Sequence, residues 1–306
     1  MPHLSRELEN SQRLDLVWDR YLERSIKEST REKRGSGVRK KVSPETKMPG
    51  NWKDFLRDSA NKDELFSFLS QTMGAIEFPQ NKQLYLTEGT NVICKGSSCS
   101  MQECFHEEAD TRIVVHLCHA LETGKRKILV RTVDTDVVVI LVGQFFSLLL
   151  LYPDMDLWVT FGMGKGLCQY HINTICLNLG PKKSRALPLY HAFSGCDTTS
   201  FFYNKGKKSS WAAWQAYPDA TDAFLHMREH PFEPIELSSS TFQRLERLTV
   251  VMYDKTSNLS TVNEARRELF CKKNSSLENI PPTQVTNCKC ILKFLHLFPL
   301  FLSHGF

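Results

Sequence analysis

The chain has 306 residues, of which 41% are apolar and 24% are charged, and its formal net charge is +5. A chain of this length and composition can bury a full core, which predicts one large globular domain or a domain with an appendage. Its ten cysteines follow no disulfide-framework spacing, and no apolar signal segment follows Met1. These features exclude a disulfide-stapled secreted module and predict an intracellular protein with reduced thiols.

Two cysteine groups raise the alternative of structural zinc. One is Cys288-Lys289-Cys290 and the other is Cys99 with Cys104. Neither comes with a second ligand pair at the spacing that structural zinc sites use, so plain thiols are favoured over zinc.

Basic residues are unevenly distributed along the chain. Six of them lie within the eleven residues from 31 to 41, where Glu32 is the single acid: Arg31, Lys33, Arg34, Arg39, Lys40 and Lys41. A second group is Lys205-Gly206-Lys207-Lys208. Two basic groups suit a polyanion such as nucleic acid, although such runs also occur as solvated surface or as import signals that direct a protein to the nucleus.

The first third of the chain predicts a strand, several helices and a strand pair. Residues 14–18 predict a short buried strand ending at Asp19, and a charged helix is expected from about residue 23 to 34. Apolar residues at helical spacing follow between 52 and 69, where Asn61 is expected to cap the second of two helices. A pair of edge strands is expected between 82 and 93.

The middle of the chain alternates between strand and helix patterns. Apolar residues on one helical face predict a helix at 109–121, so that Glu108 and Asp110 stand at its start. The β-branched run at 127–133 is typical of a central parallel strand, and Asp134 and Asp136 follow at its carboxyl end, where open α/β sheets bind their ligands.

Residues 137–151 form an apolar run that is too short to span a bilayer, which predicts a buried helix. A strand at 157–161 and helices at 170–179 and 187–193 follow, and the last helix leads into Gly195-Cys196-Asp197. The alternation predicts an α/β fold with a mainly parallel sheet flanked by helices. Three regions are expected: a core at 1–209 with a linker at about 35–50, a helical appendage at 210–284, and an atypical apolar tail at 285–306.

Three short acidic motifs stand at the ends of apolar runs: Glu107-Glu108-Ala109-Asp110, Asp134-Thr135-Asp136 and Gly195-Cys196-Asp197. Hard cations such as Mg²⁺ and Mn²⁺ take carboxylate oxygens as ligands, and two ions about 3.5–4 Å apart can hold the attacking and the leaving oxygen of a phosphodiester. The motifs therefore predict nucleic-acid cleavage with two Mg²⁺ or Mn²⁺ ions as cofactors.

Each of these acids also has a structural explanation. Glu108 and Asp110 would complement a helix dipole, and Glu107 is expected to be a cap residue. Asp134 and Asp136 would be ordinary turn acids after a strand, and Asp197 would suit a helix cap together with Thr198. The nearby histidines are expected to pack in the core or at the surface; they are His106, His116, His119 and His191.

In order and spacing, the motifs resemble the flap-endonuclease and 5′-nuclease group of the PIN-like superfamily. In that family a helix opens with E-A-[ED], a strand ends in D-x-D, and G-x-D precedes a turn that contains glycine and lysine. The matching residues are Glu108-Ala109-Asp110, Asp134-Thr135-Asp136, Gly195-Cys196-Asp197 and Gly206-Lys207-Lys208-Ser209, and Val17-Trp18-Asp19 is similar to the family's second strand with its acidic tip. The resemblance covers about residues 14–208. The sequence segments HEEADTR, TVDTDVVV and HAFSGCDTT are also similar to segments of animal proteins thought to descend from mobile elements.

The resemblance implies a structure-sensitive nuclease that acts on nucleic acid, and on DNA rather than RNA. It implies no membrane partner. The implied metal ligands are Asp19, Glu108, Asp110, Asp134, Asp136 and Asp197. The implied catalytic residues are Asp134 and Asp136, with Lys33 and Arg34 at the scissile phosphate. The implied nucleic-acid-binding residues are Arg31, Lys33, Arg34, Lys205, Gly206, Lys207 and Lys208.

The sequence departs from the family in one respect. The family begins with an additional strand whose terminal Asp completes the first metal site, and no strand-like segment precedes Leu14. The first ligand is therefore expected to be missing, and Asp15 is not expected to replace it because it lies in the same strand as Asp19. Two alternatives follow: a catalytically weakened PIN-like module that binds nucleic acid or a protein without cutting, and a truncated mobile-element product without activity of its own.

Overall fold

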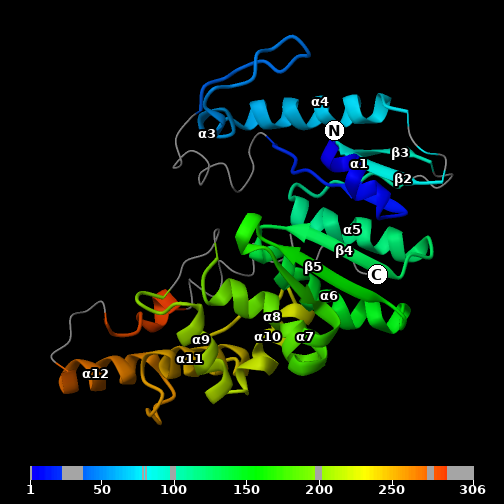
Figure 1. Cartoon of the computed structure of the whole chain (residues 1–306). Coiled ribbons are helices and arrows are strands. Elements are labelled where there is room, and N and C mark those ends of the chain that lie inside the picture. Colours follow the sequence, from blue (N-terminus) through cyan, green and yellow to red (C-terminus); the bar gives the residue numbers. More distant parts are fainter. Residues whose placement is uncertain are drawn as a thin grey trace. The chain divides into compact units, whose positions relative to one another are not determined.

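A computed structural model describes residues 2–22, 37–77, 79, 81–96, 101–196, 202–273 and 279–287, with the side chains of residues 2–5, 272 and 273 excepted. The chain divides into two compact units, an N-terminal unit, Met1–Lys125, and a C-terminal unit, Arg126–Phe306 (Figure 1). Each unit holds a small mixed sheet flanked by helices, so the protein is α/β. Among the helices of the described residues, none combines the length and the apolar character needed to cross a bilayer.

The N-terminal unit is built on a three-stranded sheet in the order β1-β2-β3. β1 runs parallel to β2, and β2 runs antiparallel to β3. Gly89, whose φ is +56°, makes the tight turn between β2 and β3. The elements of this unit are α1 (Pro2–Glu9), β1 (Arg13–Leu16), α3 (Trp52–Phe55), α4 (Ser59–Ala75), β2 (Gln83–Glu88), β3 (Asn91–Lys95) and α5 (Ala109–Glu122).

Side chains on β2 alternate between two packed faces, as expected of a strand with helices on both sides. Leu84 and Leu86 are buried in a cluster with Met73 of α4, and α4 runs along this face of the sheet (Figure 1). Tyr85 points the other way and makes an edge contact with the His119 ring of α5, 5.3 Å between ring centroids. The sheet therefore lies between α4 and α5.

The C-terminal unit is built on a second three-stranded sheet in the order β4-β5-β6. β4 and β5 are parallel and are joined through α6, whereas β5 and β6 are antiparallel. The elements are β4 (Lys127–Thr132), α6 (Thr135–Leu151), β5 (Asp156–Phe161), the short helix η1 (Gly164–Gly166), β6 (Cys168–His171), α7 (Ile172–Leu179), α8 (Pro181–Phe193), α9 (Lys207–Ala216), α10 (Ala220–Glu229), α11 (Ser240–Tyr253) and α12 (Val262–Lys273).

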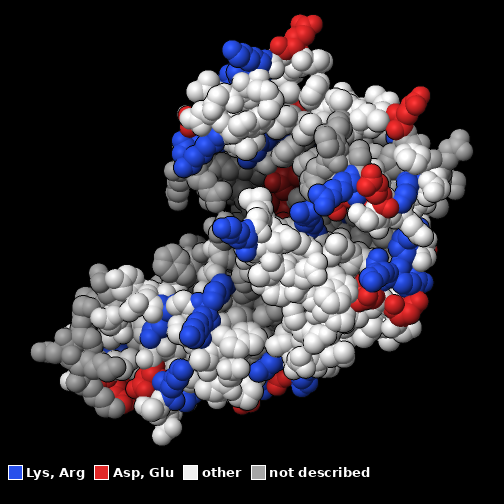
Figure 2. Space-filling model, viewed as in Figure 1, with Lys and Arg blue, Asp and Glu red and all other residues white. Residues whose placement is uncertain are grey.

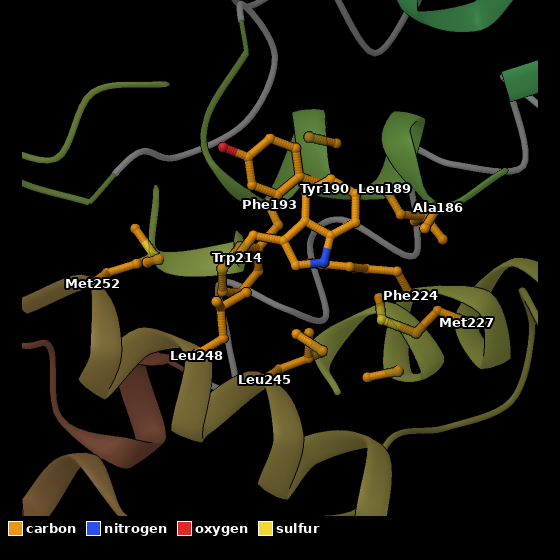
Figure 3. Packing of buried hydrophobic residues seen from close by; sticks show 14 of the residues in the cluster. Ala186, Leu189, Tyr190, Phe193, Trp214, Phe224, Met227, Leu245, Leu248 and Met252 are labelled. Atoms are coloured by element: carbon orange, nitrogen blue, oxygen red, sulfur yellow. The ribbon is translucent and has the colours of Figure 1, made fainter. Parts of the chain in front are cut away.

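The helices after residue 206 pack on α8 through one apolar cluster. Trp214 of α9 lies at its centre, stacked on the Tyr190 ring of α8 at 4.4 Å, with Leu245 and Leu248 of α11 on its other side (Figure 3). Its indole N–H donates to Thr221 Oγ1 at 3.0 Å, so the one polar atom of the ring is satisfied. This cluster joins α8 to the helices that the sequence predicts as an appendage.

A close approach between α6 and α8 is made possible by Gly143. A Cβ atom at this position would overlap Pro188 Cγ and lie 3.0 Å from Pro188 Cδ. The absence of a side chain at Gly143 therefore sets the separation of the two helices, and these helices carry Asp136 and His191.

Gly143→Ala is expected to lower the free energy of unfolding of the C-terminal unit by about 1–3 kcal/mol, because the added methyl group overpacks the contact with Pro188. Chemical denaturation of the variant and the wild type measures this difference. Gly74→Ala in α4 is the matched control, because its Cβ would make only ordinary contacts at 3.4 and 3.5 Å with Ile93. Equal stability of Gly143→Ala and the wild type would contradict the close approach.

The structure corrects three sequence-based expectations of the fold. Each sheet is mixed rather than mainly parallel, because connections as short as Gly89-Thr90 and residues 162–167 allow only antiparallel neighbours. β4 lies at an edge of the sheet of its unit rather than at the centre, and Leu129 on it is 58% exposed. Residues 168–171 form a strand ahead of α7, where the sequence predicts only a helix.

Asn61 does not cap α4. Asp58 is the N-cap and accepts the N–H of Asn61 at 2.8 Å. The Asn61 side chain is buried and bonds to the backbone of Val38, Lys40 and Phe55, so it ties the segment ahead of α3 to α4.

Candidate functional site

The predicted acids of the C-terminal unit stand where β4 ends and α6 begins. Asp134 is the N-cap of α6, and its Oδ1 accepts the N–H of Asp136 at 2.8 Å. Asp136 lies in the first turn of the helix, whose dipole favours negative charge at this end. Asp134 is exposed and Asp136 is half-buried. The transition from strand to helix therefore presents two neighbouring carboxylates at the carboxyl end of a parallel strand pair.

His191 of α8 holds Asp136 in position. Its Nε2 lies 2.9 Å from Asp136 Oδ1, and the side chains of His191 and Asp136 are only 15% and 25% exposed. An imidazole that donates to a carboxylate fixes the orientation of that carboxylate, which is how proteins commonly support a metal ligand. The sequence assigns His191 to packing, and this partnership is missed because it joins residues 55 positions apart without a local signal.

Lys207 at the start of α9 is an exposed residue whose ammonium group is bonded to the end of α8. The ammonium donates to the backbone oxygen of His191 and to Ser194 Oγ, so it satisfies the carboxyl end of α8. Burial lowers the pKa of Lys207 to about 8, and the proximity of Cys196 and Asp136 opposes this effect. The Lys207 ammonium, which the sequence predicts to bind a nucleic-acid backbone, is therefore bonded within the unit near Asp134 and Asp136.

A small cavity lies behind this cluster. Its volume is about 10 Å³, and its lining includes Asp136, Ile140, Pro188, His191 and Cys196. A space of this size holds about one water molecule. A nucleotide cannot enter it, so any chemistry on a polymer substrate has to take place at the exposed rim beside Asp134.

Along the predicted 205–208 turn, Lys205 is half-buried, whereas Gly206, Lys207 and Lys208 are exposed. Lys205 places its ammonium 4.7 Å from the centre of the Tyr253 ring, Gly206 is the N-cap of α9, and Lys208 is exposed. On the face of the C-terminal unit drawn in Figure 2, Lys and Arg side chains lie in separate groups and do not merge into one continuous patch. Lys208 is the residue of this turn best placed to meet a phosphate.

The predicted acids of the N-terminal unit gather at the start of α5. Asp19, which follows β1, accepts the N–H of Ala109 on its Oδ1 at 2.8 Å and the hydroxyl of Tyr21 on its Oδ2 at 3.1 Å. Glu108 is the N-cap residue of α5 but makes no capping bond with its side chain, and Asp110 lies in the first turn. Asp19 therefore supplies the capping oxygen that Glu108 does not, and the three acids surround one helix start.

A pocket of about 320 Å³ opens beside Asp19 within the N-terminal unit. Asp63 on its wall has a raised pKa, because burial outweighs the nearby charge of Arg20. Arg112 also lines it and is 1% exposed, and its Nη1 donates to the backbone oxygen of Trp18 at 3.2 Å. Burial lowers the pKa of Arg112. This pocket is large enough for a small polar group and is lined by both signs of charge.

The remaining predicted site residues lie outside the described residues. They are Asp197, Arg31, Lys33 and Arg34. The described acids form one group in each unit, Asp19 with Glu108 and Asp110 in the N-terminal unit, and Asp134 with Asp136 in the C-terminal unit. That both groups bind the same ions stays a prediction from the sequence.

The donor set of the C-terminal group suits a hard divalent cation. Carboxylate oxygens are the ligands that Mg²⁺ and Mn²⁺ prefer. The single backbone N–H that Asp134 Oδ1 accepts leaves further lone pairs on this carboxylate, which has about four acceptor positions. Asp134 and Asp136 therefore fit a role as ligands, with His191 as the orienting partner of Asp136.

Comparison of the chain with models of protein families, with curated proteins and with solved structures finds no match.

Proposed function

We propose that this protein hydrolyses phosphodiester bonds of nucleic acid, DNA rather than RNA, with the help of Mg²⁺ or Mn²⁺. The observation that carries the proposal is the pair Asp134 and Asp136 at the exposed carboxyl end of β4, with Asp136 held by His191 at 2.9 Å. An acid that only complements a helix dipole needs no half-buried orienting partner. The bond to His191 therefore favours a role in which the direction of the carboxylate matters.

Asp134 and Asp136 would hold the metal ions in the C-terminal unit, and Asp197 follows Cys196 of the same cluster in the sequence. Asp19, Glu108 and Asp110 are the proposed ligands from the N-terminal unit. Bound divalent ions would activate a water molecule and offset the negative charge that develops on the phosphate. The contribution of His191 is to hold Asp136 in one orientation. Lys208 offers a positive charge to the polymer backbone at the surface.

A cleavage assay with the full chain tests the proposal. A labelled DNA flap and a labelled hairpin are incubated with the protein and Mn²⁺, and the products are separated by length. We expect cleavage that leaves a 5′-phosphate, and we expect Asp134→Asn combined with Asp136→Asn to reduce its rate at least about 100-fold, since loss of transition-state charge stabilisation has this magnitude.

Asp219→Asn is the matched control for this assay. Asp219 is also an exposed acid at the start of a helix of the C-terminal unit, and its side chain makes no capping bond. The control is expected to cleave at the wild-type rate. Cleavage by the double variant at the same rate as by the wild type would overturn the proposal, because it would show that these two carboxylates are not needed.

A second candidate is a PIN-like module that binds nucleic acid without cutting it. The observation that favours it is that both carboxylates already have partners within the unit, since Asp134 Oδ1 accepts the N–H of Asp136 and Asp136 bonds to His191. This candidate is selected over the nuclease if the wild type binds DNA in a gel-shift measurement but does not cleave it in Mn²⁺ or Mg²⁺.

A further inference from the structure

Three potential metal-binding side chains converge at the carboxyl end of α10, separate from the acidic pair of the proposed nuclease. His226 and His230 are four residues apart and therefore lie one turn apart on the same side of the helix. Their rings are neighbours, with centroids 4.7 Å apart. Glu233 comes three residues after His230 and completes the group.

The local sequence explains why Glu233 returns to the helix. The N–H of His230 is bonded to the backbone oxygen of His226 at 2.9 Å, and Pro231 then follows, which cannot continue the helix. The chain turns, and the N–H of Glu233 bonds to the backbone oxygen of His230 at 3.2 Å. This turn carries the Glu233 carboxylate back beside both imidazole rings.

The distances between the potential ligand atoms are close to those of a metal site. Glu233 Oε2 lies 3.9 Å from His226 Nε2 and 3.7 Å from His230 Nδ1. One ligand atom from each of the three residues lies within 4.8 Å of the others. In a tetrahedral zinc site, bonds of about 2.0–2.1 Å place the ligand atoms roughly 3.3 Å from one another. Small side-chain rotations are therefore sufficient to close the three ligands around one ion.

The donor set selects the class of metal. Two imidazole nitrogens and one carboxylate oxygen suit Zn²⁺ and related transition metals, whereas Mg²⁺ and Ca²⁺ prefer oxygen ligands alone. The negative end of the α10 dipole also favours a cation at this position. This chemistry differs from that of Asp134 and Asp136, so the two metal requirements can be separated experimentally.

The helix that carries the two histidines is held firmly. Phe224 and Met227 of α10 are buried in the apolar cluster with α8 and α11. Arg228 donates to the backbone oxygen of Arg185 at 3.1 Å and to Gln144 Oε1 at 3.2 Å, which fixes α10 against α8 and α6. A rigid helix lowers the cost of ordering the ligands when an ion binds.

We propose that His226, His230 and Glu233 bind one Zn²⁺ ion at the carboxyl end of α10, with a fourth coordination position open to water or to an external ligand. The three side chains are 45%, 53% and 55% exposed. The ion therefore lies at the surface, where its open position can accept a donor from solution.

The full chain is first stripped of bound metal with a chelator. Its zinc binding is then measured by competition with a chromophoric zinc indicator. The wild type is compared with His226→Ala combined with His230→Ala. We expect the wild type to bind about one Zn²⁺ ion at this site and the double variant to lose at least about tenfold in affinity, because two of the three protein ligands are removed. The fold of each variant is checked by circular dichroism, and exposed side chains such as these can be replaced without disturbing the core.

Glu233→Gln and Glu236→Gln are a matched pair for the carboxylate. Both remove one negative charge from an exposed glutamate of the same loop, but only Glu233 reaches the histidines. We expect Glu233→Gln to weaken zinc binding and Glu236→Gln to leave it unchanged.

Co²⁺ substitution distinguishes this site from the ten cysteines of the chain. A nitrogen and oxygen site gives visible ligand-field absorption without the near-ultraviolet charge-transfer bands of thiolate ligands. The proposal would be overturned if the wild type and the double histidine variant bound zinc with equal affinity. It would also be overturned if thiolate bands dominated the Co²⁺ spectra of both proteins. None of the three residues belongs to the proposed nuclease site, so this result is independent of whether the protein cuts DNA.

Discussion

Asp15→Ala is expected to lower the free energy of unfolding of the N-terminal unit by about 3–5 kcal/mol, because it leaves buried polar and charged groups without their partner. Asp15 accepts from Arg13 Nε and Arg13 Nη2, each at 2.7 Å, and its Oδ2 lies 2.8 Å from His116 Nδ1. The side chains of Arg13 and His116 are only 5% and 4% exposed. Without the carboxylate, the Arg13 guanidinium would lose its acidic partner and keep uncharged ones, Thr123 Oγ1 at 3.1 Å and the Tyr85 ring.

The pH dependence of this effect follows from the pKa of Asp15. Burial favours its neutral form, but the hydrogen bonds and charges of Arg13 and His116 outweigh burial and hold the pKa below its ordinary value of 3.8. A lowered pKa in the folded state means that the stabilisation is fully present above the ordinary value and is lost as the pH falls through the lowered one. The difference in stability between the wild type and Asp15→Asn should therefore shrink as the pH falls below 3.8 and through the lowered pKa.

Hydrogen exchange of α5 peptides in increasing urea measures the stability of this unit by itself. Asp54→Ala is the control, because Asp54 also pairs with an arginine of the unit, Arg57 at 3.1 Å, but both side chains are more than 40% exposed. A surface pair of this kind contributes about 0–1 kcal/mol. If Asp15→Ala and Asp54→Ala lower the free energy of unfolding by similar amounts, the stabilising role of the buried network is contradicted.

Trp214→Ala is expected to destabilise the C-terminal unit by about 3–5 kcal/mol, the usual cost of removing a large buried aromatic side chain. Trp214 is 1% exposed, stacks on Tyr190 and makes an edge contact with Phe224 at 5.7 Å between ring centroids. The cavity left by the indole lies where α8, α9, α10 and α11 meet, so the surrounding helices can close it only in part.

Urea denaturation followed by far-ultraviolet circular dichroism measures this loss. Trp52→Ala removes the same side chain from the N-terminal unit, where Trp52 is 39% exposed, and serves as the control. If Trp214→Ala lowers the free energy of unfolding no more than Trp52→Ala does, the central position of Trp214 in the core is contradicted. Trp214→Phe is expected to lose less than Trp214→Ala, since it keeps a ring against Tyr190 and gives up mainly the bond to Thr221.

The two proposed metal sites rest on different chemistry within the same unit. Asp134 and Asp136 offer oxygen ligands at the end of a strand, whereas His226, His230 and Glu233 offer nitrogen and oxygen ligands at the end of a helix. Zinc binding and Mn²⁺-dependent cleavage can therefore be tested in the same preparation with separate variants, and failure of one leaves the other standing.

The elements around the acidic motifs were predictable because their signals are local. The apolar stripe at 109–121 and the apolar run at 137–151 specify α5 and α6, and acids at helix starts are a recognised pattern, so Glu108, Asp110, Asp134 and Asp136 fall at those starts in the structure. The four-residue spacing of His226 and His230 is an equally local signal, because it places both imidazole rings on the same side of a helix.

Local sequence predicts most of the helices and strands and the positions of the acids along them, because neighbouring residues decide hydrophobic periodicity and capping; α1 and β6 are the exceptions. Which side chains meet depends on the packing of the whole chain. The bond of His191 to Asp136, the bonds of Lys207 to the end of α8 and the network of Arg13, Asp15 and His116 each join segments that are distant in sequence. Such contacts depend on the close packing of whole helices, as at Gly143 and Pro188, and packing at this level leaves no pattern in a short stretch of sequence.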